Sequence, residues 1–260
     1  MNITSTGTKG SRALGTLALV SLVTLVAFGF LFSPRDEVQG DAVRLMYVHV
    51  PSAWLAYLSF FVTFVCSVGY LVPKTRSLAW DRVAAASAEI GVLFTGLALV
   101  TGMIWGRITW GVFWTWDARL TTTALLFLLF LGYLAMRRMP ASQEQRAKRS
   151  AILGVIAFVD VPIVHMSVRW WDTLHQDPTI LRTDFDPQMD GLMLTTLMLG
   201  VVAFTITYLW LLMHRLRVGR MEEWLETNAL EQAIQERRAE AGLTDTPLPA
   251  TGPAVTGVQR

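Results

Sequence analysis

The sequence from Trp105 to Leu120 reads WGRITWGVFWTWDARL and joins two apolar runs, 84–104 and 120–136. It combines four tryptophans and a phenylalanine with two arginines and one aspartate. Indole rings favour the membrane–water boundary, which accommodates both an apolar ring and an N–H donor. The pattern therefore predicts two membrane-spanning helices, joined at the membrane surface by a platform for a flat, apolar and partly charged molecule.

The composition supports a membrane protein. Of the 260 residues, 53% are hydrophobic and 16% are charged, and the mean hydropathy is +0.43. A soluble domain of this size rarely reaches such values. The single cysteine, Cys66, excludes an internal disulfide, a cysteine zinc cluster and the C-x-x-C-H attachment site of c-type cytochromes.

Six segments are long and apolar enough to cross a bilayer, which takes about 20 helical residues. They are 13–32, 51–72, 84–104, 120–136, 151–167 and 192–213. The first is too long for a signal-peptide core and is interpreted as a retained span. The fifth is interrupted by Asp160 and Pro162, so Asp160 should face protein or a cavity, either as a functional group or as a hydrogen-bonded structural one.

The distribution of lysine and arginine predicts the orientation. The two termini and the connections after the second and fourth spans carry 16 of these residues, and the other three connections carry 6. By the positive-inside rule both termini are cytoplasmic. We expect an all-α protein with a cytoplasmic tail at 1–12, a six-helix domain at 13–220 and a cytoplasmic tail at 221–260. Within that tail, 221–241 should be helical, and the residues from 242 on should be disordered.

Three of the four histidines, His49, His165 and His175, fall on the predicted outer side. Neutral imidazole is the commonest protein ligand of haem iron, and two histidines on separate outer segments could bind one iron from both faces. The alternative for any single histidine is a hydrogen-bonded residue at the interface.

The residues around these histidines suit a porphyrin. Tryptophan faces would cover its ring, and arginines would pair with its carboxylates. The candidates are Trp105, Trp110, Trp114 and Trp116 with Arg44 and Arg119. Asp117 could cap the following helix or hold an indole, guanidinium or imidazole N–H. The alternative for the arginines is that they snorkel to the interface.

Three motifs carry a family resemblance: WGVFWTWDARLT at 110–121, MYVHVPSAW at 46–54 and VRWWDTLHQ at 168–176. The first resembles the tryptophan-rich signature of haem-handling membrane proteins. Together, over about residues 13–215, they resemble the CcmC family, the six-span component of the bacterial cytochrome c maturation pathway called system I. Phe113 stands where the family usually has tryptophan, which keeps the ring but removes an N–H donor.

The resemblance implies that His49 and His175 are the axial ligands of haem b at the periplasmic face of the inner membrane, and that the tryptophan segment is its platform. It implies delivery of haem to the chaperone CcmE, with CcmD and the ATP-hydrolysing pair CcmA and CcmB as partners. The chain has no G-x-x-x-x-G-K phosphate loop, in agreement with a separate ATPase subunit. We therefore expect a protein that presents haem and has no dedicated catalytic side chain. It should contact membrane lipid and should not bind nucleic acid.

Three other classes are considered. A b-type membrane electron carrier would need paired histidines deep in the bundle, and none of the four lies at mid-span. A haem or solute transporter could use Asp160 on its path, but the absence of other mid-span charges disfavours ion coupling. A structural subunit would use its tryptophans only as membrane anchors and would tolerate phenylalanine at each outer position.

Overall fold

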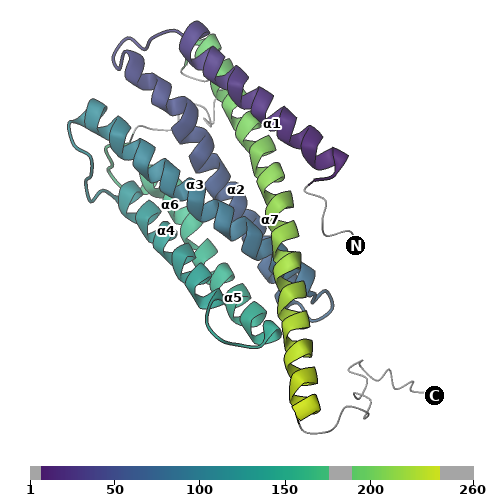
Figure 1. Cartoon of the computed structure of the whole chain (residues 1–260). Helices are drawn as coiled ribbons and strands as arrows, with labels where there is room; N and C mark the ends of the chain where they lie inside the picture. The colour runs from purple at the N-terminus through teal and green to yellow at the C-terminus, as the bar shows by residue number, and fades with distance from the viewer. Residues whose placement is uncertain (1–6, 176–188, 241–260) are drawn as a thin grey trace. The chain divides into compact units, whose positions relative to one another are not determined.

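The computed structural model describes residues 7–175 and 189–240, which form helices and the turns between them (Figure 1). A π-helical turn, Phe28–Phe32, ends the first helix, and a 3-10 turn, Asp41–Leu45, starts the second. The α-helices are α1 (Lys9–Ala27), α2 (Met46–Leu71), α3 (Leu78–Trp110), α4 (Ala118–Arg137), α5 (Gln143–Phe158), α6 (Asp160–Trp170) and α7 (Gly191–Glu240).

The prediction of an all-α protein with six spans is confirmed, because six helical segments in the described ranges are long and apolar enough to cross a membrane. They are Lys9–Phe32, Asp41–Leu71, Leu78–Trp110, Ala118–Arg137, Gln143–Trp170 and Gly191–Leu225. Each starts before its apolar run and four of the six also end beyond it, because polar and aromatic residues continue these helices. The chain is thus a multi-pass membrane protein by the length and composition of its helices.

The fifth span is broken where the sequence indicated. α5 ends at Phe158 and α6 starts at Asp160, with Pro162 in its first turn, where its lack of an N–H does least harm. Asp160 is 5% exposed, and its Oδ2 has no hydrogen-bond partner among the described residues. Asp160 therefore faces protein rather than lipid. The alternative of a hydrogen-bonded structural residue does not hold for its Oδ2.

The sequence predicted a single connection over the tryptophan segment, 105–120. In the structure the two ends of this segment belong to helices α3 and α4. α3 continues to Trp110 and ends at Gly111, whose φ of 77° is a left-handed conformation that suits glycine. Asp117 is the N-cap of α4, and its Oδ1 accepts the Leu120 N–H at 2.8 Å. The cap role of Asp117 is thereby confirmed, and the connection is only residues 111–117.

α2 and α3 form the centre of the bundle, and α4, α5 and α7 pack around them. Phe60 of α2 stacks on Phe130 of α4, with 3.7 Å between ring centroids. Polar pairs also join the helices: the Ser87 and Tyr208 hydroxyls hydrogen-bond at 2.8 Å, which ties α3 to α7. Such contacts add specificity where apolar packing alone discriminates little between helix faces.

Two ion pairs join helices of the bundle, and one of them corrects the expectation that no charge other than Asp160 lies inside a span. Glu89 lies inside the third span and pairs with Arg215 of α7. Asp81, at the start of α3, accepts two hydrogen bonds from Arg137 of α4. The sequence does not reveal either pairing, because the paired residues are 126 and 56 positions apart. These charges are therefore accounted for by helix packing.

The contacts between Cα atoms divide the chain into residues 1–217 and 218–260. α7 extends into the second part and is described to Glu240, which confirms a helix over most of 221–241. The division falls three residues before the expected boundary at 220. The expectation for the residues from 242 on concerns residues outside the described part.

Candidate functional site

The starts of α2, α4 and α7 lie at the same end of the bundle as the ends of α3 and α6 (Figure 1). We call this end the tryptophan end; it comprises residues 39–54, 101–119 and 165–175. The three connections that the arginine count placed on one side therefore do meet at one end. The structure also shows how individual candidate residues are held there.

His49 lies in the first turns of α2 and packs against α3. Its Nδ1 is 3.0 Å from the backbone oxygen of Ala98 and 3.2 Å from the hydroxyl oxygen of Thr101. A carbonyl oxygen only accepts, so Nδ1 carries the proton and donates it. In the neutral ring the lone pair is then on Nε2, the arrangement found in metal-binding histidines whose other nitrogen is anchored.

Gly102 makes room for the imidazole. A Cβ added at this position would lie 2.9 Å from His49 Cε1, closer than real Cβ atoms approach. Trp105, one helical turn of α3 further on, meets the same ring edge to face, with centroids 5.7 Å apart. The indole N–H of Trp105 donates to Gln39 Oε1 at 2.7 Å, which fixes the orientation of the indole ring.

His175 is brought to this end by the connection that follows α6. Its ring packs against Trp110, the last residue of α3, with centroids 6.4 Å apart and an angle of 61°. Asp117 Oδ2 accepts the backbone N–H of Leu174 at 3.2 Å. One carboxylate therefore caps α4 and holds the chain next to His175, a second role that the sequence did not reveal.

His49 lies close enough to His175 and Arg119 for their charges to act on it. Arg119, at the start of α4, also lies near the Tyr57 hydroxyl of α2. The structure therefore groups His49, His175 and Arg119, as the sequence predicted. Tyr57 was missed, because its tyrosine ring looks like one more apolar residue of a span.

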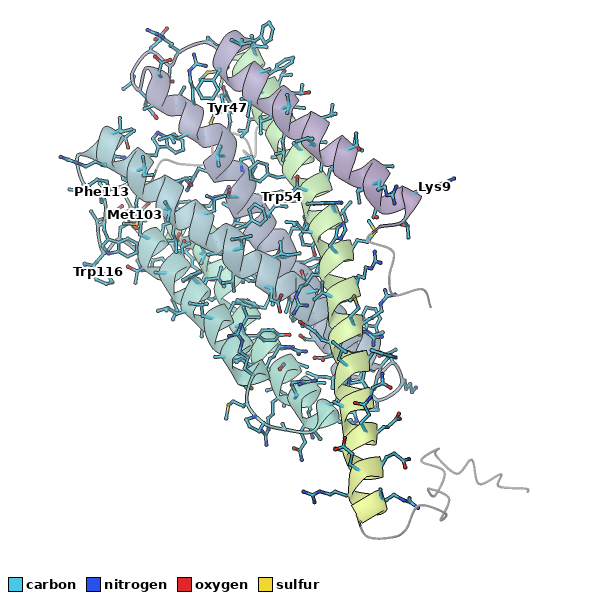
Figure 2. The ribbon with its side chains drawn as sticks, in the orientation of Figure 1. Lys9, Tyr47, Trp54, Met103, Phe113 and Trp116 are labelled. Atoms are coloured by element: carbon cyan, nitrogen blue, oxygen red, sulfur yellow. The ribbon has the colours of Figure 1, made fainter. Side chains whose placement is uncertain are left out.

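The other two tryptophans of the predicted site lie in the connection between α3 and α4. Trp114 and Trp116 meet edge to face, with ring centroids 5.5 Å apart. Figure 2 shows Phe113 and Trp116 on the surface of this connection, and Trp116 is 82% exposed. The guanidinium of Arg107 lies over Phe113, 5.8 Å from its centroid. This part of the segment presents aromatic rings outward, whereas Trp105 and Trp110 face the histidines.

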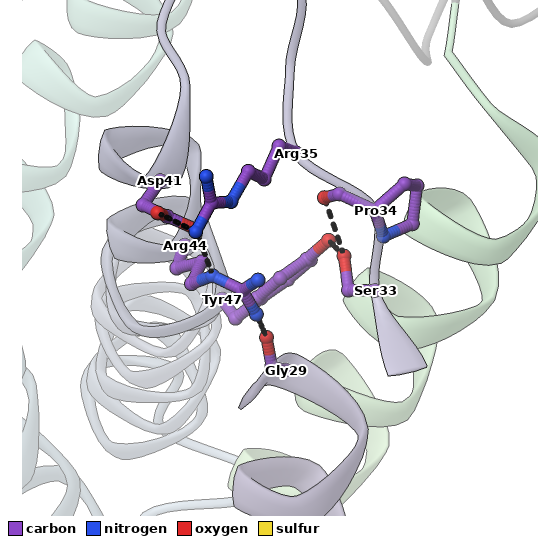
Figure 3. A network of polar contacts seen from close by, with 7 residues as sticks. All are labelled: Gly29, Ser33, Pro34, Arg35, Asp41, Arg44 and Tyr47. Atoms are coloured by element: carbon purple, nitrogen blue, oxygen red, sulfur yellow. Dashed lines mark hydrogen bonds and ion pairs between the residues drawn. The ribbon is translucent and has the colours of Figure 1, made fainter. Parts of the chain in front are cut away.

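Arg44 is occupied with neighbours of its own (Figure 3). Its Nε donates to Asp41 at 2.9 Å, its Nη1 donates to the backbone oxygen of Gly29, and its guanidinium lies over Phe30. These contacts join the start of α2 to the end of α1. A carboxylate ligand would have to share Arg44 with Asp41, so Arg119 is the better placed of the two predicted arginines.

Asp117 gives a testable prediction. Replacing it with alanine removes the N-cap of α4, at a cost of about 0.5–2 kcal/mol, and releases the Leu174 N–H. Since the family resemblance implies haem binding, we expect lower thermal stability together with a loss of haem from the purified protein, measured on the same samples. Ser142→Ala is the matched control, because Ser142 caps α5 in the same way. Equal haem loss in both variants would contradict a tethering role for Asp117.

The fold and this arrangement define a six-span membrane protein with a tryptophan-lined, two-histidine site at one end of its helical bundle. The chain belongs to the haem exporter protein C (CcmC) family, whose model matches residues 3–231. It is 40% identical to heme exporter protein C of Haemophilus influenzae over 215 residues, which is 83% of this chain and 86% of the relative.

Other relatives show the same pattern. Heme exporter protein C of Bradyrhizobium diazoefficiens is 39% identical over 80% of this chain and 78% of its own. A putative cytochrome c biosynthesis ccmC-like mitochondrial protein of Marchantia polymorpha is 40% identical over 57% of this chain and 61% of its own. The resemblance drawn from the three motifs is thereby confirmed.

Proposed function

We propose that this protein binds haem b at the periplasmic face of the bacterial inner membrane and delivers it to the chaperone CcmE. Membership of the haem exporter protein C family supports haem handling in cytochrome c maturation. The observation that carries the proposal is the convergence of two histidines from distant segments, each packed against a tryptophan of α3.

The iron ligands are His49 and His175. The Nδ1 of His49 is anchored on Ala98, which leaves the Nε2 lone pair for a metal. His175 follows a connection that Asp117 holds in place, so it can approach the second face of the iron. A haem bound between them would keep both axial positions occupied and would be protected from other ligands.

The porphyrin is covered by Trp105 and Trp110 beside the histidines, and by Trp114 and Trp116 on the outer side. One or both propionates pair with Arg119, and Arg44 contributes to the extent that Asp41 releases it. Nothing in this set is a dedicated general base. The contribution of the protein is to hold haem in one orientation for its partner, which replaces a random encounter by a fixed one.

The proposal includes a complex with CcmD, CcmA and CcmB, and both termini in the cytoplasm. The exposed aromatic connection at 111–117 then faces the periplasm, where CcmE would dock. The charge distribution supports this orientation, since the connections at the tryptophan end belong to the side with 6 of the 22 basic residues. Haem is the cargo in this scheme, and ATP hydrolysis takes place in a separate subunit.

The direct test is haem transfer to purified CcmE, followed by haem staining of the covalently loaded chaperone. We expect transfer with the wild type and a strong loss per molecule for Trp114→Ala, with unchanged amounts of protein in the membrane. Trp224→Ala is the matched control, an exposed tryptophan in the part of α7 beyond residue 217. Normal loading per molecule by Trp114→Ala, with less protein in the membrane, would indicate a structural anchor instead.

A further inference from the structure

A groove of about 380 Å³ lies between α2 and α6, outside the set of tryptophans and arginines discussed so far. Its lining consists of Trp54, Tyr57, Leu58, Phe61, Phe158, Val161, Pro162 and His165. All eight residues belong to membrane-spanning segments. Trp54 and Phe61 are 43% and 52% exposed, so the groove opens on a surface that the bilayer would cover. Its natural ligands are therefore molecules dissolved in the membrane.

The chemistry of the groove is uneven. Most of the wall is apolar and aromatic, but two polar groups meet at one end, where the His165 ring packs edge to face against Tyr57 with centroids 6.3 Å apart. Among the described residues, neither ring nitrogen of His165 hydrogen-bonds to a protein group, and the side chain is exposed. An acyl chain requires only an apolar surface. The accessible imidazole at the end of the aromatic groove therefore favours a ligand with a polar or metal-containing group.

Arg119 connects this groove to the two-histidine site. Its guanidinium lies near the Tyr57 hydroxyl, and its charge acts on both His165 and His49. A ligand whose carboxylate lies at the His165–Tyr57 end of the groove would thus meet the guanidinium of Arg119. The same cation is within electrostatic reach of the proposed iron ligand. The groove and the two-histidine site thus share Arg119. A ligand carboxylate could stay paired with Arg119 while the ligand moves from the groove to the histidines.

We propose that the groove is a lateral entrance through which haem reaches the two-histidine site from the bilayer. This inference rests on the proposed function. The flat apolar ring lies against Tyr57 and Phe61, a propionate pairs with Arg119, and His165 donates a nitrogen lone pair to the iron. The transfer would be a ligand exchange that leaves the oxidation state of the iron unchanged: the bond to His165 breaks, a bond to one of His49 and His175 replaces it, and the other histidine fills the coordination position that is open or held by water in the groove.

The test is the rate at which haem passes from phosphatidylcholine–phosphatidylglycerol vesicles to the protein in nanodiscs, followed by the absorption of haem with two histidine ligands. We expect His165→Ala to slow this rate about tenfold, equivalent to ~1.4 kcal/mol, and to leave the final haem content unchanged. His214→Ala is the control, because this histidine contacts Trp210 of α7 and is outside the groove. Equal rates for His165→Ala and wild type would overturn the proposal.

A second variant set separates this proposal from the proposed function. In a His49→Ala/His175→Ala background, we expect a small residual haem signal that disappears on adding His165→Ala. A residual signal that is independent of His165 would overturn the entrance, and so would a lower final haem content of His165→Ala at an unchanged rate. If the wild type acquires no haem with two histidine ligands but retains His165-dependent haem, the two-histidine site fails, and the groove is a haem site of its own rather than an entrance.

Discussion

Replacing either His49 or His175 with alanine is expected to remove most of the haem that is recovered with the purified protein. Each variant leaves the iron with one protein ligand, and the site loses the grip that comes from binding both faces of the porphyrin. The expected loss is at least about tenfold, which corresponds to ~1.4 kcal/mol of binding free energy. A pyridine haemochrome assay measures the content, and the absorption spectrum of the remaining haem reports its ligands.

His214→Ala is the matched control for this experiment. It also removes an imidazole next to a tryptophan, with ring centroids 4.9 Å apart, but in α7 and away from the tryptophan end. It should retain the haem content of the wild type. Unchanged content in both His49→Ala and His175→Ala would refute the assignment of the ligands. A redox-active haem that turns over with quinone in those variants would favour a membrane electron carrier.

Replacing Gly102 with leucine is expected to have an effect of similar size, although this residue has no chemistry of its own. Even a Cβ at this position would lie 2.9 Å from His49 Cε1, and leucine adds three further carbons. The imidazole would have to leave Ala98, and Nε2 would no longer point in its present direction. Haem content should therefore fall several-fold while the helix, which gains a better helix former, keeps its stability.

Gly132→Leu in α4 is the control, because a Cβ there has no neighbour within 4 Å. Both variants make the same chemical change in a membrane-spanning helix, and only one of them crowds an imidazole. A Gly102→Ala variant should fall between Gly102→Leu and the wild type. Full haem content in Gly102→Leu would show that the position of His49 against α3 is not needed for binding.

Much of the architecture follows from local sequence. The six apolar runs predict the spans, because a helix is the one way for a single segment to satisfy its backbone in lipid. Asp160 and Pro162 predict the break between α5 and α6, and Asp117 predicts the start of α4. Such signals depend on residues a few positions apart, so they can be read without knowledge of the packing. The helix ends extend past the apolar runs, because amphipathic residues continue a helix into the interface.

The site was predictable in composition but not in arrangement. The three motifs contain His49, His175 and most of the predicted tryptophans. They also show that Phe113 stands where the family usually has tryptophan. Which arginine faces the site depends on its partners in the fold: Asp41 and Gly29 hold Arg44, whereas Arg119 lies near Tyr57 of another helix. Side-chain direction on a helix depends on the neighbouring helix, which spacing alone does not reveal.

The sequence by itself determined the number of spans, the cap of α4 and the gathering of histidines and tryptophans at one end of the bundle, because these properties depend on local hydrophobicity, charge and capping. Only the tertiary structure decided how His49 is oriented by Ala98 and Gly102, how Asp117 reaches Leu174, and that a groove containing His165 adjoins the same cation. These features arise where helices far apart in the chain meet, and their energy lies in contacts that form only after the bundle has packed.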